Sequence, residues 1–245
     1  MHIPIPFGKS ENILPRNSTG ATANADLLIS VDCLDTDPLS SFAILRHQVS
    51  LQRHTTNGKG PMEKAKINDH FTRFPYRKEI HADGGVNNGG IDLVDEPNRI
   101  DEIHEIKDWP WLRRFVEEVN LKPGHFMTFG CDFGPDDGYY SGYVEFSFRP
   151  SMRQLTTDDL RILDEHFYKW ISDLYLDDSS EPHPLEYCKG SLAWEYTPLE
   201  YKGTYEKVSV WFRVTEPQGA EWLINHLRHF LVEIYPSFPH IKKPT

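Results

Sequence analysis

The alternation of apolar and polar residues in the C-terminal half of the chain predicts one unit that occurs twice. In the first copy, residues 125–133 and 143–149 are expected to form two strands joined by a turn at 134–138. Apolar residues then recur every three or four positions behind Thr156, which predicts a helix that starts there. The apolar positions of this helix are Leu160, Leu163, Phe167, Ile171 and Leu174.

The second copy follows in the same order. Residues 191–196 and 207–214 predict another hairpin, and Pro217 marks the start of another helix. The apolar positions of that helix are Ala220, Leu223, Leu227, Phe230, Leu231 and Ile234. Two ββα units can bury their apolar faces against each other. We therefore predict an α+β fold in which a four-stranded antiparallel sheet carries both helices on one face.

The N-terminal half lacks such a regular pattern. Residues 1–25 hold three prolines and a polar run, which predicts an extended arm. Residues 26–120 are expected to be an irregular, mixed region with a buried strand at 27–31, a glycine-rich loop at 84–90 and short helices before the repeat. The repeated ββα sandwich then occupies residues 121–245.

Composition narrows the class of protein. The mean hydropathy is −0.55, and no apolar run approaches the ~18–20 residues that a membrane span needs. Aromatic residues make up 13% of the 245, which favours a core built from large rings. The three cysteines have no C-x-x-C spacing, so we expect reduced thiols rather than disulfides or a thiolate zinc site. With no signal sequence at its start, the chain is expected to be cytoplasmic.

Charge is concentrated in one region. The chain has 26 basic and 37 acidic residues, a formal net charge of −11. Residues 132–206 hold 16 acidic and 6 basic residues, so that −10 of the charge falls there. This excess of acidic residues opposes binding to nucleic-acid phosphates and attracts a basic partner. A solvated, solubilising surface would have the same composition.

The two hairpins combine acidic residues with tyrosine, and we expect their loops to gather at one end of the sheet. Tyrosine and charged pairs dominate many protein interfaces. The candidate partner-binding residues are Asp132, Asp136, Asp137, Tyr139, Tyr140, Glu195, Glu200, Tyr201, Tyr205 and Glu206. Their carboxylates could instead perform acid–base chemistry or hold Mg²⁺ or Ca²⁺, and the rings could simply cover the ends of the sheet.

These features favour a non-enzymatic, acidic binding or inhibitor protein that neutralises a basic protein partner such as a toxin or nuclease. In behaviour it would resemble immunity proteins and phage-encoded inhibitors. This hypothesis assigns no catalytic residue and no cofactor. It leaves open a homodimer formed through an exposed strand. A small-molecule-binding module built on the aromatic sheet is a third hypothesis.

The alternative is a divalent-metal-dependent enzyme of the oxygenase or hydrolase type. His81-Ala82-Asp83 places a histidine and a carboxylate two residues apart and resembles the first part of the motif of 2-oxoglutarate-dependent oxygenases. The resemblance implies iron, or manganese in a related site, with His125 or His183 as the distal ligand. That family also has a downstream arginine and a jelly-roll fold. No arginine lies about ten residues after His125 or His183, and the ββα pattern is not that of a jelly roll.

Overall fold

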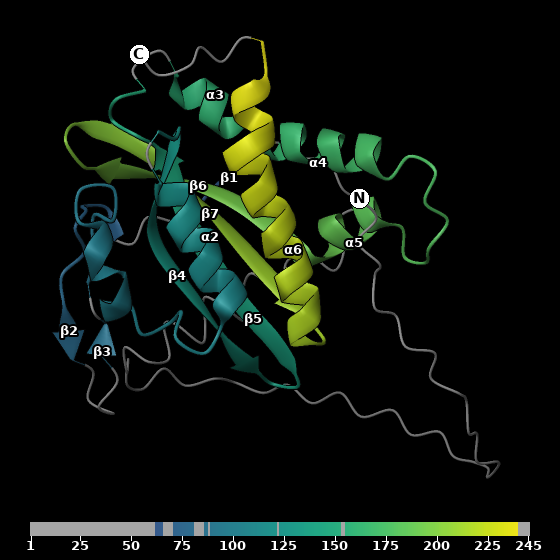
Figure 1. Cartoon of the computed structure of the whole chain (residues 1–245), viewed down its shortest axis with the longest axis horizontal. Helices are drawn as coiled ribbons and strands as arrows, with labels where there is room; N and C mark the ends of the chain where they lie inside the picture. The colour runs from purple at the N-terminus through teal and green to yellow at the C-terminus, as the bar shows by residue number, and fades with distance from the viewer. Residues whose placement is uncertain are drawn as a thin grey trace, which may run out of the picture. The chain divides into compact units, whose positions relative to one another are not determined.

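Two antiparallel hairpins form the centre of the structure (Figure 1). The computed structural model describes residues 62–239 except 66–70, 81–85, 88, 122 and 153–154. All of these residues belong to one compact unit, residues 57–245. The first hairpin consists of β4 (Phe126–Asp136) and β5 (Tyr139–Phe148). The second consists of β6 (Leu192–Glu200) and β7 (Thr204–Val214).

The hairpins join through their second strands. The strand order is β1-β6-β7-β5-β4, and β5 pairs antiparallel with β7 so that Val144 lies opposite Val210. The fold class α+β is confirmed, but the predicted four-stranded antiparallel sheet is wrong in detail. A fifth strand, β1 (Glu63–Lys64), runs parallel to β6 and makes the sheet mixed. Two residues are too few to show an alternating pattern, so this strand had no sequence signal.

The turn of the first hairpin is shorter than the predicted 134–138. Asp137 and Gly138 alone connect β4 to β5, with φ values of 45° and 79°. Positive φ at both positions is typical of the type I′ turn that closes two-residue hairpins. Pro135 remains within the strand because β4 is an edge strand. Asp136 and Tyr139 form the hydrogen-bonded pair beside the turn, so the nitrogen of residue 135 points to the open edge, where proline is tolerated.

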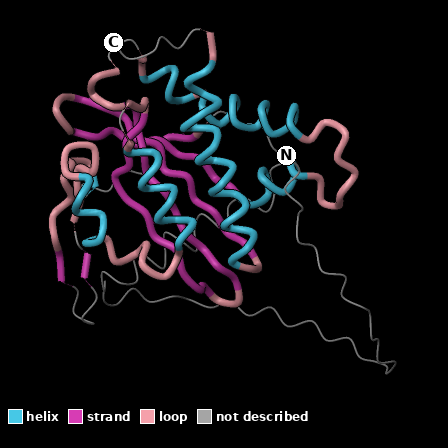
Figure 2. The backbone as a smooth tube through the Cα atoms, in the orientation of Figure 1, coloured by secondary structure: helices cyan, strands magenta, loops and turns pink. Residues whose placement is uncertain are grey.

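Helices cover one face of the sheet (Figure 2). The helix predicted behind Thr156 begins with a capping box between Thr156 and Asp159, and is divided at Ile162 into two pieces. The helix at Pro217 continues into a π-helical segment and a short 3-10 turn. The helices are α2 (Pro110–Asn120), α3 (Thr157–Arg161), α4 (Leu163–Leu174), α5 (Pro184–Ser191), α6 (Pro217–His229), η3 (Phe230–Ile234) and η4 (Tyr235–Ser237).

The described part of the region before residue 121 shares its core with both ββα units. Ile106, Leu112 and Phe115 are fully buried in the same cluster as Val144 and Val210. This region also contains a 3-10 helix, η2 (Pro97–Glu102), and a small sheet of β2 (Glu79–Ile80) and β3 (Val86–Asn87). None of the described helices is long and apolar enough to cross a membrane.

A buried arginine joins α2 to the sheet. Arg149 is 5% exposed, and its guanidinium donates to the carbonyl oxygens of Phe126 and Leu121 at 2.6 Å and of Val119 at 3.1 Å. Two of these carbonyls lie at the C-terminal end of α2, where helix carbonyls lack partners within the helix. Arg149 therefore fixes the end of α2 beside the first strand of the repeat.

The other face of the sheet carries a second, smaller core. Residues 71–76 lie across one end of this face, and the amide of Phe74 donates to the carbonyl of Glu200 at 3.0 Å. The buried residues of this cluster are Phe74, Tyr76, Met127, Phe129, Leu199 and Tyr201. We call residues 71–76 the strap.

Candidate functional site

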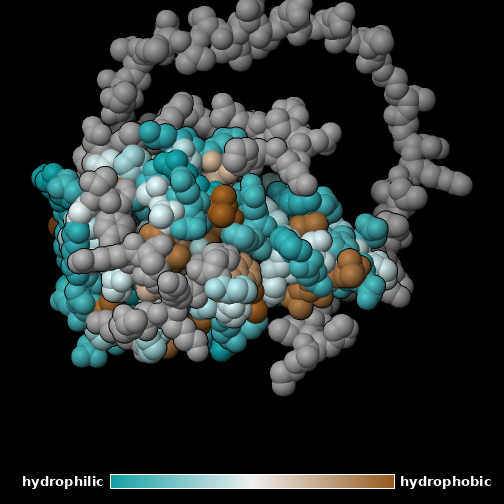
Figure 3. All heavy atoms as spheres, turned by 90° about the horizontal axis from the view of Figure 1, so that it is seen from above, coloured by the Kyte–Doolittle hydropathy of each residue, from teal (hydrophilic) through white to brown (hydrophobic). Residues whose placement is uncertain are grey.

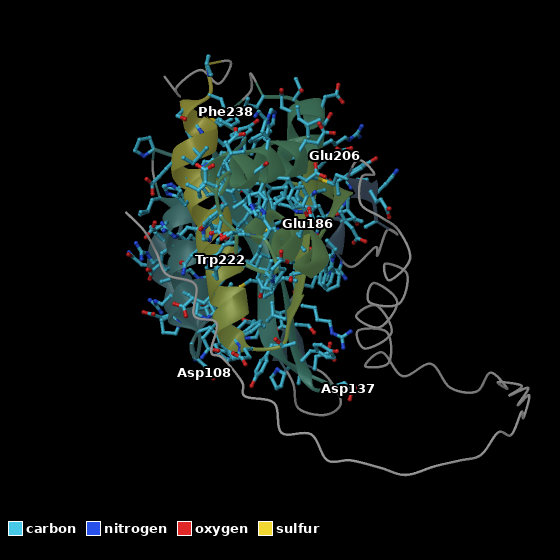
Figure 4. The ribbon with its side chains drawn as sticks, turned by 90° about the vertical axis from the view of Figure 1, so that its right-hand side faces the viewer. Asp108, Asp137, Glu186, Glu206, Trp222 and Phe238 are labelled. Atoms are coloured by element: carbon cyan, nitrogen blue, oxygen red, sulfur yellow. The ribbon has the colours of Figure 1, made fainter. Side chains whose placement is uncertain are left out.

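The two hairpin loops lie at opposite ends of the sheet. Tyr140, at the start of β5, pairs with Val214, at the end of β7. Figure 4 shows the consequence, with Asp137 at one end of the molecule and Glu206 towards the other. The prediction that the loops gather at one end is wrong. Because the hairpins pair antiparallel through their second strands, their tips must point in opposite directions.

The second loop is occupied by contacts within the chain. Arg73 of the strap contacts Glu200 at 2.7 Å, and Arg161 of α3 makes a two-pronged ion pair with Glu206. Tyr201 is 6% exposed and donates to the carboxylate of Asp92, and burial raises its pKa to about 12. These residues attach the strap and α3 to the sheet. The side chain of Tyr205 lies outside the described residues.

The first hairpin turn exposes two of its predicted residues, whereas Asp136 and Tyr140 are half-buried. Asp137 is exposed in the turn, and the Tyr139 side chain is also exposed, at 42%. The Arg213 guanidinium lies 4.1 Å from the centre of the Tyr139 ring, which holds the ring in place. Asp136 accepts a hydrogen bond from Ser141. The turn therefore offers two carboxylates and a tyrosine ring on a rigid, two-residue connection.

Two predicted residues from different hairpins, Asp132 and Glu195, lie at the two ends of a row of side chains on the sheet face opposite α2 and α6. Asp132 pairs with Tyr143, which pairs with Trp211, and the centres of these two rings are 4.9 Å apart. The Trp211 indole nitrogen donates to Glu195 at 3.1 Å. Burial, then the charges of Glu145 and Asp132, raise the pKa of Tyr143, so its phenol is neutral. Tyr143 and Trp211 were not among the predicted site residues, although both alternate with buried valines.

A buried polar cluster lies beside Tyr143 and Trp211 on the same face of the sheet. Its residues were also absent from the predicted site. The Lys207 ammonium donates to Glu145 and to the Tyr76 hydroxyl, both at 2.6 Å, and the Tyr76 hydroxyl donates to Glu145 at 2.7 Å. Ser209 donates to the same carboxylate at 3.2 Å. Burial and the nearby Glu145 raise the pKa of Tyr76 well above its ordinary value. With its members hydrogen-bonded to one another, this cluster anchors the strap to the sheet.

Half of the predicted metal site falls outside the described residues. His81 and Asp83 lie outside the described residues. His183 caps α5: its Nδ1 accepts from the Leu185 amide, and its Nε2 donates to the Tyr175 carbonyl. His125 is buried at the start of β4. Within the described ranges there is no group of three or more His, Cys, Asp or Glu side chains that could hold a metal ion.

Comparison with known proteins adds no family to this description. No protein-family model, curated protein or solved structure matches the chain.

Proposed function

We propose that this chain is a non-enzymatic, acidic binding protein that neutralises a basic protein partner, and that the turn of the first hairpin makes the primary contact. The observation that carries the proposal is the difference between the two loops. Glu200 and Glu206 are paired with arginines of the same chain, whereas Asp137 is exposed and forms no ion pair among the described residues.

The exposed turn matches the chemistry of a basic surface. Asp136 and Asp137 supply two carboxylates, and Tyr139 supplies a ring of the kind that anchors many interfaces. The short turn keeps these groups in place before binding, which lowers the entropy cost of association. The net charge of −11 accelerates the encounter with a positive partner over a distance of about one Debye length.

The experiment compares two variants that remove the same number of charges. Asp136→Asn/Asp137→Asn/Tyr139→Ala changes the turn, whereas Asp158→Asn/Glu165→Gln changes α3 and α4. Each protein is titrated calorimetrically with a peptide of ten arginines at low and moderate salt. Quantitative pull-downs from source lysate are run in parallel with the wild type and the two variants.

We expect the turn variant to bind the peptide at least about tenfold more weakly than the α3–α4 variant. We also expect a partner in the pull-down that is lost only with the turn variant and is weakened by salt. Equal weakening by both variants would mean that only the net charge matters, and would refute the turn as the contact. Retention of all captured proteins by the turn variant would refute the proposal as well.

A further inference from the structure

The connection between α4 and α5 exposes two leucines. Leu174 ends α4 with 51% of its surface exposed, and Leu176 has 76% exposed. In Figure 3, hydrophobic residues lie among hydrophilic ones on the side of the molecule where Figure 1 places this connection. A large apolar side chain loses the benefit of burial when it remains in water, so two such leucines within three residues suggest a surface that another molecule covers.

The residue between the leucines is held inside. The Tyr175 hydroxyl contacts His226 Nε2 at 2.8 Å, which ties the end of α4 to α6. The Tyr175 carbonyl accepts from the Asp178 amide at 3.0 Å and from His183 at 2.9 Å. Because Tyr175 points inward and its backbone is fixed, Leu174 and Leu176 on either side stay outside. The leucines are thus displayed by a rigid connection.

Acidic residues surround the leucines. Asp173, Asp177, Asp178 and Glu181 lie within nine positions, and Lys169 pairs with Asp173 at 2.9 Å. The last turn of α4 contains no basic residue. The C-terminal end of a helix carries a partial negative charge, so acidic groups there disfavour the helix. Apart from Asp173, which Lys169 neutralises, these acidic groups place negative charge beside the two leucines.

We propose that Leu174, Leu176, Asp177 and Glu181 form a docking surface, the acidic leucine surface, for a basic amphipathic segment of a partner protein. The leucines would contact the apolar side of the segment, and the carboxylates would face its lysines or arginines. Anionic lipids would be repelled by the same carboxylates. In a symmetric dimer the carboxylates of the two copies would meet. This proposal stands apart from the contact proposed for the first hairpin.

The test uses the full chain and a 15-residue synthetic peptide with lysine and leucine on opposite helical faces. A second peptide has serine in place of each leucine. Binding is measured by fluorescence anisotropy for the wild type and for Leu174→Ser/Leu176→Ser. Leu121→Ser is the matched control, because Leu121 is 61% exposed at the end of α2. A third variant, Asp177→Asn/Glu181→Gln, tests the charges.

We expect Leu174→Ser/Leu176→Ser to weaken binding of the leucine peptide at least about tenfold without lowering the thermal midpoint. Leu121→Ser should bind like the wild type, and Asp177→Asn/Glu181→Gln should reduce the dependence of the dissociation constant on salt. Asp136→Asn/Asp137→Asn/Tyr139→Ala should bind this peptide normally.

Several outcomes would overturn the proposal. One is unchanged binding by Leu174→Ser/Leu176→Ser, and another is an equal loss with Leu121→Ser. Equal affinity of the wild type for the serine and leucine peptides would show that charge alone drives binding. Leucine-dependent binding to phosphatidylserine vesicles would identify a membrane surface. Leucine-dependent self-association in sedimentation would identify a second copy as the occupant.

Discussion

At the scale of single residues, Lys207 and Glu145 show how burial changes the value of an ion pair. Their side chains are 3% and 11% exposed and lie 2.6 Å apart. Taking each charge out of water is costly, and the two compensate each other only while both are present. The exposed pair of Lys169 and Asp173 has a similar distance, 2.9 Å, but remains in water.

We predict that Lys207→Met lowers the free energy of unfolding by about 3–5 kcal/mol, because it leaves the Glu145 carboxylate buried without a cation. Lys207→Met/Glu145→Leu should recover only part of this loss, because the buried Tyr76 hydroxyl then loses both of its partners. Urea unfolding followed by tryptophan fluorescence measures both values.

Lys169→Met is the matched control, and its cost should stay below about 1 kcal/mol because the pair is exposed. If Lys207→Met costs no more than Lys169→Met, the cluster is not the anchor that its burial indicates.

At the scale of elements, Tyr175 and His226 connect α4 to α6. The Tyr175 hydroxyl contacts Nε2 at 2.8 Å, and Nδ1 lies 2.8 Å from the Trp222 carbonyl, so Nδ1 donates and Nε2 accepts. Burial, and to a smaller degree the neighbouring His229, lower the pKa of His226 from 6.5. The neutral ring therefore fits this position, and protonation would replace the acceptor at Nε2 with a donor facing the Tyr175 hydroxyl.

We predict that this connection weakens in acid. The unfolded chain binds a proton at this histidine more readily than the folded chain, so its contribution to stability is constant above pH 6.5 and is lost as pH falls below it. His226→Gln should be less stable at pH 7.5 but should lose less of its thermal midpoint between pH 7.5 and 5 than the wild type. Calorimetric scans across this range provide the measurement.

Asp164 changes stability with pH in the direction opposite to His226, so the prediction needs a control for Asp164. Burial raises its pKa from 3.8 to about 6, so the folded chain gains stability from its protonation as pH falls through that range. The comparison is therefore repeated in Asp164→Asn, where Asp164 no longer offsets the loss of stability in acid and the difference made by His226 should remain. An identical pH dependence with and without His226 would contradict the prediction.

At the scale of the whole molecule, the helix before residue 121 and the ββα repeat form one core. Leu112 and Phe115 of α2 are fully buried in the cluster that contains Val144, Val210 and Leu223. Removing α2 would expose apolar area on both units. Each fully buried large side chain contributes roughly 1.5–3 kcal/mol, and total stability is only about 5–15 kcal/mol.

We therefore predict that the full chain unfolds this core in one cooperative transition and that a fragment of residues 121–245 has none. Urea titrations with near-ultraviolet circular dichroism test both. A sharp transition in the fragment, at a midpoint near that of the full chain, would show that the repeat folds without α2.

Local patterns predict the two hairpins, the helices behind Thr156 and Pro217 and the α+β class, whereas α5 was not among the predicted helices. Alternation at 144–148 and helical spacing from Leu160 to Ile171 are local patterns, and burial of one face of each element follows from them. The acidic excess of residues 132–206 was equally visible, because charge is a property of composition.

The contacts of the predicted residues depend on how distant parts of the chain pair with one another. The antiparallel pairing of β5 with β7 separated Asp137 from Glu206, and distant arginines paired with Glu200 and Glu206. The cluster of Tyr76, Glu145 and Lys207 joins residues up to 131 positions apart. Such contacts depend on strand order and register, which no local pattern encodes. The exposure of Leu176 depends on them as well, because it follows from the inward position of Tyr175 against α6.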